Sequence, residues 1–253
     1  MSMGIRVTLG VLALALSVPG KSAAQASSFE FEIEGGLVWQ SGNNVEVPND
    51  GTATRFSLRD AVGSGPWGVG RVYLTWHRSE SQSLRLLIAP LSVTAAGVLS
   101  TPVDFAGANY AVGAPVQGTY AFNSYRATYR WRVHSDEQSA AWIGFTAKIR
   151  DASIVLAQGP TTSRTDNIGF VPLLHLAADR QVGPVQLMFD ADALAGGPGR
   201  AIDASLKLSY DLNERLSLRA GYRTVEGGAD VDSVYNFAWL NYGVFSLAWR
   251  PGA

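Results

Sequence analysis

The chain has 253 residues, a formal net charge of −1 at pH 7 and no cysteine. Disulfide and thiol chemistry are therefore excluded, and no nucleic-acid partner is expected because the basic excess typical of such proteins is missing. Charged residues make up 16% of the chain, below the ~25% usual for soluble domains. With 27 glycines and 10% aromatic residues, this composition favours β-strands.

The N-terminal segment has the organisation of a secretory signal peptide. Arg6 precedes an apolar stretch at residues 7–18, which is followed by Pro19 and Gly20 and by a run of small residues. The alternative, a membrane anchor, needs ~20 apolar residues. The sequence therefore predicts a signal peptide over residues 1–26 and one domain over residues 27–253. No later segment is apolar for long enough to predict a membrane-spanning helix.

Alternating hydrophobicity is the main structural signal in the rest of the chain. In residues 29–40 every second residue is apolar and those between are mostly acidic, with one break at Val38. Soluble β-sandwiches also alternate, but their strands usually have only about five or six residues. Segments of about ten residues with charges on one face are typical of outer-membrane β-barrels. The same alternation recurs at residues 71–77, 125–133, 143–150, 185–192, 202–210 and 216–223.

The connections between these segments alternate in length. Short polar connections at 79–83, 134–138, 179–183 and 211–214 alternate with longer ones at 41–68, 92–118, 157–166, 195–200 and 225–233. Short periplasmic turns and long external loops are the rule in bacterial barrels. We therefore predict an all-β fold, a closed antiparallel transmembrane β-barrel of about ten strands, with eight or twelve as alternatives. Residues 53–60 are interpreted as part of the first long loop.

This topology predicts an aromatic girdle on the lipid face at the periplasmic ends of the strands. Two segments fit the alternation less well. Residues 84–91 contain few polar residues, and residues 168–178 are apolar on both faces around Pro172 and His175. The expected girdle residues are Phe29, Trp76, Trp131, Tyr210 and Trp249.

Taken together, the signal peptide, the alternating strands, the uneven connections and a last strand ending in Phe245, Leu247 and Trp249 resemble the small outer-membrane β-barrel proteins of Gram-negative bacteria, of the OmpA/OmpX-like kind. The resemblance covers the mature chain as a pattern, without a specific motif. It implies a location in the bacterial outer membrane after removal of the signal peptide, with lipid as a partner.

The inner face of the predicted barrel carries charges of both signs. We expect a luminal charge wall composed of Arg126, Arg130, Arg132, Lys148 and Arg150 with Glu30, Glu32 and Glu34. The basic residues lie on two neighbouring strands, roughly opposite the first strand with its glutamates. One interpretation is a salt-bridged plug, since buried charges must be paired or hydrated. The other is a water-filled pore with a charged wall.

Enzymatic and metal-binding readings have less support. His77 and Ser79 have a spacing reminiscent of lipid A deacylases, but no matching acidic residue is evident, and His134 lies in a polar turn. His175 could be a luminal hydrogen-bonding residue. No cluster of His and carboxylates has metal-ligand spacing, so neither a metal nor a cofactor is expected.

The sequence thus predicts a non-enzymatic outer-membrane barrel with a structural, loop-mediated binding or narrow-pore role. Small ions in the lumen or an extracellular ligand at the loops are the candidate partners. The alternative is a membrane-embedded lipid hydrolase or acyltransferase of the small-barrel type.

Overall fold

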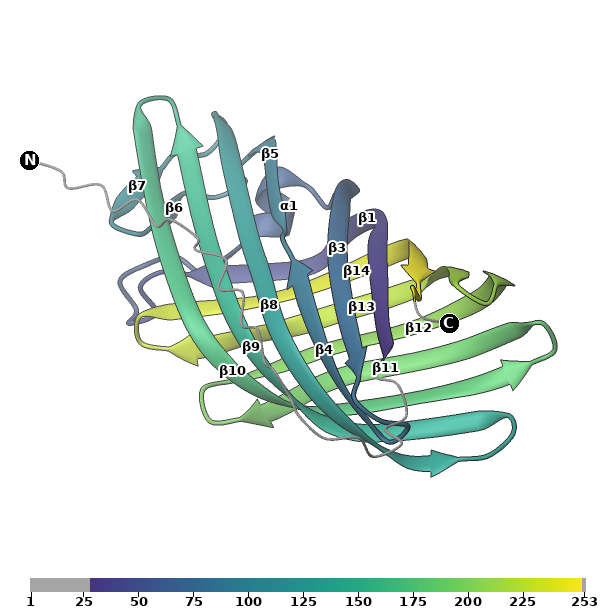
Figure 1. Cartoon of the computed structure of the whole chain (residues 1–253). Helices are drawn as coiled ribbons and strands as arrows, with labels where there is room; N and C mark the ends of the chain where they lie inside the picture. The colour runs from purple at the N-terminus through teal and green to yellow at the C-terminus, as the bar shows by residue number, and fades with distance from the viewer. Residues whose placement is uncertain (1–27, 252–253) are drawn as a thin grey trace, which may run out of the picture.

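A computed structural model describes residues 28–251, so the expected signal peptide lies outside the described residues (Figure 1). The described chain is built almost wholly from antiparallel strands. The strands of the wall are β1 (Ser28–Glu46), β3 (Trp67–His77), β4 (Gln82–Ala89), β5 (Ser92–Val98), β8 (Pro115–Ser135), β9 (Ser139–Gln158), β10 (Thr161–Val182), β11 (Val185–Gly196), β12 (Gly199–Asn213), β13 (Leu216–Val231) and β14 (Val234–Trp249).

The sheet closes on itself. Each wall strand pairs with the next, and β14 pairs with β1 from Phe31 opposite Trp249 to Glu46 opposite Tyr235. β4 and β5 both pair with β8 and share one place in the wall, separated by Pro90 and Leu91. The ring therefore has about 10 strands, and the prediction of a closed antiparallel barrel is confirmed.

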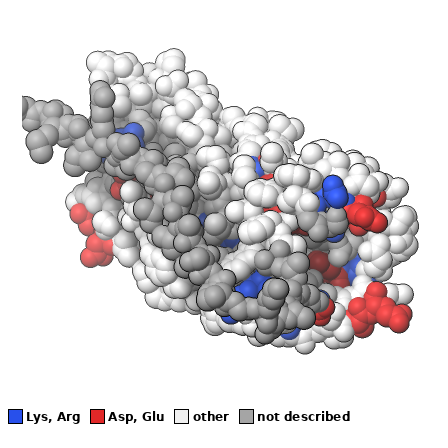
Figure 2. All heavy atoms as spheres, in the orientation of Figure 1, with Lys and Arg blue, Asp and Glu red and all other residues white. Residues whose placement is uncertain are grey.

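Side chains alternate between the lumen and the outer surface, as the sequence predicts. Glu34 is buried, whereas Ile33 beside it is 67% exposed. Val38, which breaks the sequence pattern, also faces inward and is buried. Side chains therefore still alternate in direction at Val38. What changes is the inward residue type, from acidic at Glu34 to apolar at Val38. On the visible face in Figure 2, acidic groups gather at the left and at the right of the molecule.

Several strands are longer than the sequence analysis expects. β10 has 22 residues and continues its pairing with β9 up to Thr161 opposite Gln158. The connections expected to be long at 157–166, 195–200 and 225–233 are therefore short turns between extended strands. The outward residues of these extensions, such as Arg164 and Asp166, are polar and exposed. A strand with polar residues on its outer face has the composition of a loop, so the sequence analysis expected loops here.

The two remaining long loops fold inward. The first, residues 47–66, contains β2 (Phe56–Ser57) and α1 (Leu58–Val62), and the second, residues 99–114, contains the β6 (Val103–Phe105) and β7 (Ala108–Tyr110) hairpin. β2 pairs with β1 at Val45 and adds no strand to the wall. Both loops pack against inward-facing apolar residues of the wall. This cluster, here called the apolar plug, includes Val38, Val45, Leu58, Val62, Phe105, Tyr110, Val116, Tyr120, Leu156 and Leu240.

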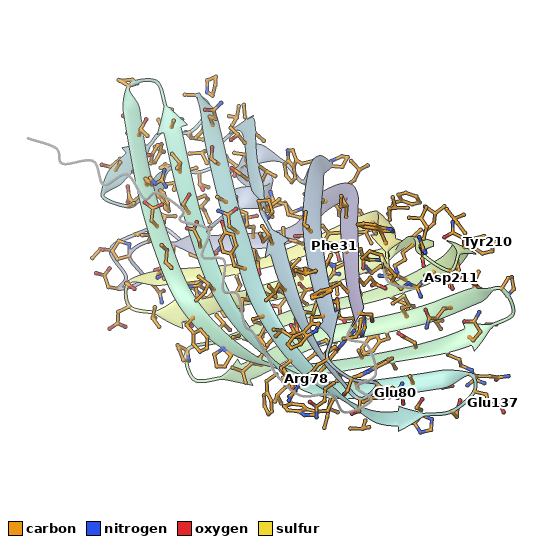
Figure 3. The ribbon with its side chains drawn as sticks, viewed as in Figure 1. Phe31, Arg78, Glu80, Glu137, Tyr210 and Asp211 are labelled. Atoms are coloured by element: carbon orange, nitrogen blue, oxygen red, sulfur yellow. The ribbon has the colours of Figure 1, made fainter. Side chains whose placement is uncertain are left out.

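The opposite end of the barrel carries only short turns. Figure 3 shows Arg78, Glu80, Glu137 and Asp211 at that end, where the β3–β4, β8–β9 and β12–β13 turns lie. The first residues of β1 and the last residues of β14 lie there too, because Phe31 pairs with Trp249. In outer-membrane barrels this is the periplasmic end. Among residues 28–251, no helix is both long and apolar enough to cross a membrane.

Candidate functional site

The half of the lumen nearer the short turns is filled by ion pairs, here called the charged layer. Lys207 of β12 binds two glutamates of β1, with its Nζ 2.7 Å from Glu32 Oε1 and 2.8 Å from Glu34 Oε2. Arg219 of β13 donates to Glu30 at 3.0 Å and also to Glu32. The acidic face of β1 is thus neutralised by β12 and β13.

Arg126 of β8 is the centre of the other part of the charged layer. Its guanidinium lies 2.9 Å from Asp192 and 2.5 Å from Asp203. Asp203 also accepts from Arg223 at 2.6 Å, and Arg71 lies 3.6 Å from it. Sequence analysis placed the basic residues of β8 opposite the glutamates of β1, but the partners of Arg126 are these aspartates of β11 and β12.

The other residues of the expected charge wall lie at different depths. Arg130 donates to Ser83 Oγ at 2.8 Å and has no carboxylate partner within 4.0 Å among the described residues. Arg132 lies near the end of β8 and pairs with Glu80 in the β3–β4 turn at 3.5 Å. Arg132 therefore lies at the short-turn mouth of the barrel and not in a wall inside it. Lys148 lies opposite Arg126 in the β8–β9 ladder, at the edge of the charged layer, and Arg150 lies two residues further along β9; both line the cleft described below.

The residues expected to form the aromatic girdle lie near the short-turn end. Phe29, Trp131, Tyr210 and Trp249 have between 37% and 49% of their surface exposed, and Trp76 is half-buried. The rings of Phe31 and Trp249 lie 5.8 Å apart. These residues stand on the outer face of their strands.

The three histidines lie on different strands, β3, β8 and β10. His134 is at the exposed β8–β9 turn, 3.0 Å from Asp136. His77 is half-buried at the short-turn end of β3. His175 is sealed inside the charged layer with no exposed side-chain surface, and its Nδ1 lies 2.8 Å from Asp192 Oδ1. The expectation that His175 is a luminal hydrogen-bonding residue agrees with this position.

One seam of the barrel wall is incomplete. β10 pairs with β9 over residues 161–180. With β11 it pairs only over residues 174–182, and the last pair is Leu174 opposite Ala193. Above Leu174 the two strands separate. Pro172 stands two residues beyond this last pair, and proline has no N–H to donate to a sheet.

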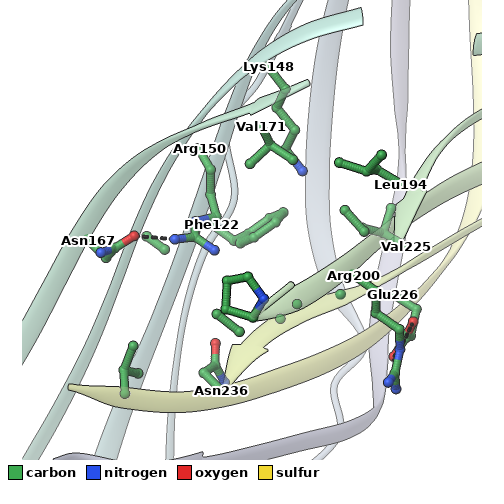
Figure 4. Close-up of a pocket in the computed structure, with 18 of the residues that line it drawn as sticks. Phe122, Lys148, Arg150, Asn167, Val171, Leu194, Arg200, Val225, Glu226 and Asn236 are labelled. Atoms are coloured by element: carbon green, nitrogen blue, oxygen red, sulfur yellow. Dashed lines mark hydrogen bonds and ion pairs between the residues drawn. The ribbon is translucent and has the colours of Figure 1, made fainter. Parts of the chain in front are cut away.

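A cleft of about 450 Å³ occupies the space behind this open seam. Inward residues of β9 and β10 form one side and residues of β11 to β14 form the other. We call this the wall cleft. In Figure 4, Lys148, Arg150 and Val171 extend into it from one side and Leu194 and Val225 from the other. Its apolar lining includes Phe122, Ile154, Phe170, Val171, Leu173, Leu194, Ile202, Val225 and Val234.

The cleft lining also contains six charged side chains, of which four are paired: Arg200 with Glu226, Asp203 with Arg126 and Arg223, and Asp166 with Arg164. The other two are the cations Lys148 and Arg150. Lys148 is 3% exposed, and its Nζ lies 4.7 Å from the centre of the Phe122 ring. Arg150 donates to the Asn167 side chain (Figure 4), while its Nε is buried without a partner among the described residues. No carboxylate of residues 28–251 lies within 4.0 Å of either cation. The cleft therefore combines apolar surface with two cations whose charge is not compensated by an ion pair.

Such an arrangement suits an anion with an apolar body. Ligand pockets are commonly ~300–1,000 Å³ in volume, mostly apolar, with a few polar groups that fix orientation. Arg and Lys form charge-assisted hydrogen bonds with carboxylates and phosphates. The described residues contain no group of three metal-ligating side chains.

Sequence analysis missed the wall cleft, although it noted the segment that borders it. Residues 168–178 are apolar on both faces because Phe170 and Leu174 lie on the outer face, with Phe170 at the rim of the cleft, while Val171 and Leu173 face the cleft from within. An apolar inward face in a barrel with an otherwise charged lumen, interrupted by Pro172, was the available signal.

Comparison with known proteins supports the fold. The crystal structure of outer membrane protease OmpT from Escherichia coli matches with a TM-score of 0.55 and 7% identity, covering 88% of this chain and 96% of that one. The fold is that of an outer-membrane β-barrel. Neisserial surface protein A matches with a TM-score of 0.38, 11% identity, and 89% and 99% coverage.

A further match is Ail, the attachment invasion locus protein of Yersinia pestis, with a TM-score of 0.40, 10% identity, and coverage of 88% of this chain and 98% of that one. No protein-family model and no curated protein matches the chain. The match to OmpT confirms the resemblance to Gram-negative outer-membrane barrels at the level of fold.

Proposed function

We propose that this protein is an outer-membrane barrel, closed to ions, that binds a small anionic amphiphile in the wall cleft. The observation that carries the proposal is the pair of cations, Lys148 and Arg150, facing an apolar cleft without a carboxylate partner. The proposed role is a binding role, but it places the ligand in the wall cleft, whereas the sequence analysis expected a ligand at the external loops.

The filling of the lumen argues against a pore. The charged layer occupies one half of the lumen and the apolar plug the other. The cavity between them, beside Arg71, Leu91 and Tyr242, holds about 10 Å³. A single water needs at least ~10–15 Å³ of such volume, so this cavity has no room for a hydrated ion, which supports a closed barrel.

The chemistry of the ligand follows from the lining. A buried charge is costly unless it is paired or hydrated, and a carboxylate or phosphate head group would supply the missing partner for Lys148 and Arg150. The apolar residues around Val171 and Leu194 would contact a hydrocarbon chain. A single-chain amphiphile with an anionic head group meets both requirements.

The alternative of a lipid hydrolase or acyltransferase has less support. The described residues that line the wall cleft include no histidine. His175 is sealed within the charged layer, where a lipid ester cannot reach it without breaking ion pairs. A likeness to a protease at 7% identity concerns the fold alone.

Binding of a dansyl-labelled undecanoic acid to the refolded barrel in detergent tests the proposal. We expect saturable binding to the wild type, at least about tenfold weaker binding to the double variant Lys148→Gln, Arg150→Gln, and no binding of the corresponding uncharged alcohol. Arg130→Gln is the matched control, because Arg130 is also a luminal cation without a carboxylate partner but does not line the cleft.

Equal binding by the wild type and the double variant, or equal binding of the acid and the alcohol, would overturn the anion-binding role. Planar-bilayer recording tests the closed lumen separately. We expect no stepwise current from the wild type; steady ion currents whose selectivity changes in Arg126→Glu would instead support the charged pore.

A further inference from the structure

The seam between β10 and β11 opens at the depth of the lipid chains. We infer that it is a lateral doorway, through which the anionic amphiphile of the proposed function enters the wall cleft from the membrane and not from water. This inference rests on the proposed ligand and adds its route.

The outward side chains of β10 locate the doorway in the apolar zone. Leu176, Leu174, Phe170 and Ile168 are between 54% and 75% exposed and form an apolar row on the outer face. The pairing with β11 ends at Leu174, so the open part of the seam lies beside Phe170 and Ile168. The polar outward residues begin only beyond Ile168.

The far edge of the doorway is apolar as well. Leu194 follows Asp190 and Asp192 on the inward face of β11, yet it is 39% exposed. The exposure arises because the pairing between β10 and β11 ends at Ala193. Ile202 of β12 lines the same cleft and is 41% exposed. A hydrocarbon chain passing between Phe170 and Leu194 would therefore stay in contact with apolar surface throughout.

The cations stand directly behind the doorway. In the β9–β10 ladder Lys148 is opposite Val171 and Arg150 is opposite Gly169, which are the residues just above the last β10–β11 pair. A head group bound to these cations would leave its chain pointing toward the open seam. The geometry thus matches a molecule that lies partly in the protein and partly in the bilayer.

The open seam is costly in a bilayer unless something compensates for it. Backbone N–H and C=O groups that are unpaired in hydrocarbon cost several kcal/mol each, and irregular backbone at membrane depth is tolerated where it lines a cavity. The wall cleft is such a cavity. The ladder between β3 and β4 also ends early, at Val72 opposite Ile88, but the cavity beside Arg71, Pro90 and Leu91 at that seam holds only about 10 Å³. The break between β10 and β11 has the wall cleft behind it, and a doorway that serves ligand entry accounts for that break.

A reversible bridge across the seam tests the route. The chain has no native cysteine, so Pro172→Cys with Ala195→Cys can be bridged by bifunctional thiol reagents of increasing length; these positions would face each other if the ladder continued. The matched control is Leu176→Cys with Ala191→Cys, a pair within the closed part of the same seam. The readout is the rate at which dansyl-undecanoic acid, preloaded into lipid vesicles, reaches the reconstituted barrel.

We expect bridging at 172 and 195 to slow transfer at least about tenfold and reduction to restore it, while the control bridge leaves the rate unchanged. An unchanged rate in the bridged doorway variant, with binding intact, would overturn the lateral route and leave the proposed function standing. Absence of binding in the wild type would overturn both.

A second measurement does not depend on bridging. A fluorophore attached at Leu194→Cys should be quenched by lipids with brominated chains to an extent similar to one at Leu176→Cys. A fluorophore at Asn109→Cys, at an exposed position of β7, is the unquenched reference. If the label at 194 behaves like that at 109, lipid chains do not reach the doorway and the inference fails.

Discussion

Arg85 of β4 and Asp190 of β11 meet across the lumen in a two-point ion pair, with Nη1 2.7 Å from Oδ2 and Nη2 3.0 Å from Oδ1. The two strands are not neighbours in the sheet, so this pair links opposite parts of the wall. Two parallel N–H···O bonds also fix the relative orientation of the two side chains. The charged layer therefore braces the barrel from within.

Removal of one partner of this brace should be strongly destabilising. Arg85→Met leaves Asp190 without its main cation, and breaking a buried pair in this way costs about 3–5 kcal/mol. We expect a loss toward the lower end of that range, because both side chains retain some exposure. Urea unfolding in lipid vesicles, followed by tryptophan fluorescence, measures the change.

A double-mutant cycle provides the control for this prediction. Adding Asp190→Leu to Arg85→Met should recover most of the lost stability, because no unpaired charge remains. The exposed pair Arg164–Asp166 should behave differently, with Arg164→Met costing no more than about 1 kcal/mol. Equal losses at the buried and exposed sites would contradict the bracing role.

Neutralising Lys148 should have the opposite effect on stability. Lys148 is buried without a carboxylate partner among the described residues, so Lys148→Met removes a desolvated charge and leaves no orphaned anion. We expect an unfolding free energy equal to or above that of the wild type, together with weakened binding of the anionic probe. Functional sites commonly retain such locally unfavourable groups. A loss above about 2 kcal/mol would show that Lys148 is structural.

The close approach of Gly97 in β5 to Ala61 in α1 should determine how tightly α1 packs against the wall. A Cβ placed on Gly97 would lie 1.9 Å from the carbonyl oxygen of Ala61 in α1. Gly97→Ala should therefore push α1 away from β5, cost about 1–3 kcal/mol and expose residues 47–66 to proteolysis. Gly68→Ala is the matched control, because nothing lies within 4 Å of the added Cβ. Identical cleavage of both variants would rule out the close approach.

The β8–β9 turn should contribute stability that depends on pH. The backbone N–H groups of Gln138 and Ser139 and the side chain of His134 donate to the Asp136 carboxylate, which lowers the pKa of Asp136 below its usual value. A lowered pKa favours folding above the unfolded-state pKa of about 3.9, and this contribution disappears as the pH falls through the folded-state pKa.

The stability difference between the wild type and Asp136→Ala should therefore shrink as the pH falls from about 5 to about 2.5. Urea midpoints measured across this interval test the prediction. Glu137→Ala, which removes the neighbouring exposed carboxylate, is the control. A difference that stays constant over the whole interval would show that Asp136 acts in this turn without its charge.

The barrel itself could be predicted because its cause is local. Glu32 and Ile33 are neighbours in sequence and face opposite solvents, so each strand carries its own evidence for two faces. The short polar turns can likewise be recognised from a few neighbouring residues. The strands and turns together predict about ten wall strands, which agrees with the structure. Where strands extend beyond the apolar zone, as in β10 near Arg164, both faces become polar and the local signal resembles that of a loop.

The contents of the lumen could not be predicted in the same way. Arg126 and Asp203 are 77 residues apart in sequence, and their pairing depends on barrel curvature and strand stagger, which alternation does not encode. The apolar plug and the wall cleft likewise depend on loops folding inward and on one seam failing to pair. Val38 and Pro172 both disturbed the expected pattern, and both mark places where the lumen changes its chemistry.

The charged layer also constrains how the barrel assembles. Glu32 and Glu34 are separated from their partner Lys207 by 175 and 173 residues in the sequence. β1 is brought beside β12 and β13 by its ladder with β14. Before that last ladder forms, the glutamates of β1 remain hydrated on an open sheet. Ring closure and dehydration of the lumen are thus a single event, and a nascent barrel cannot expel its inner water until its first and last strands have met.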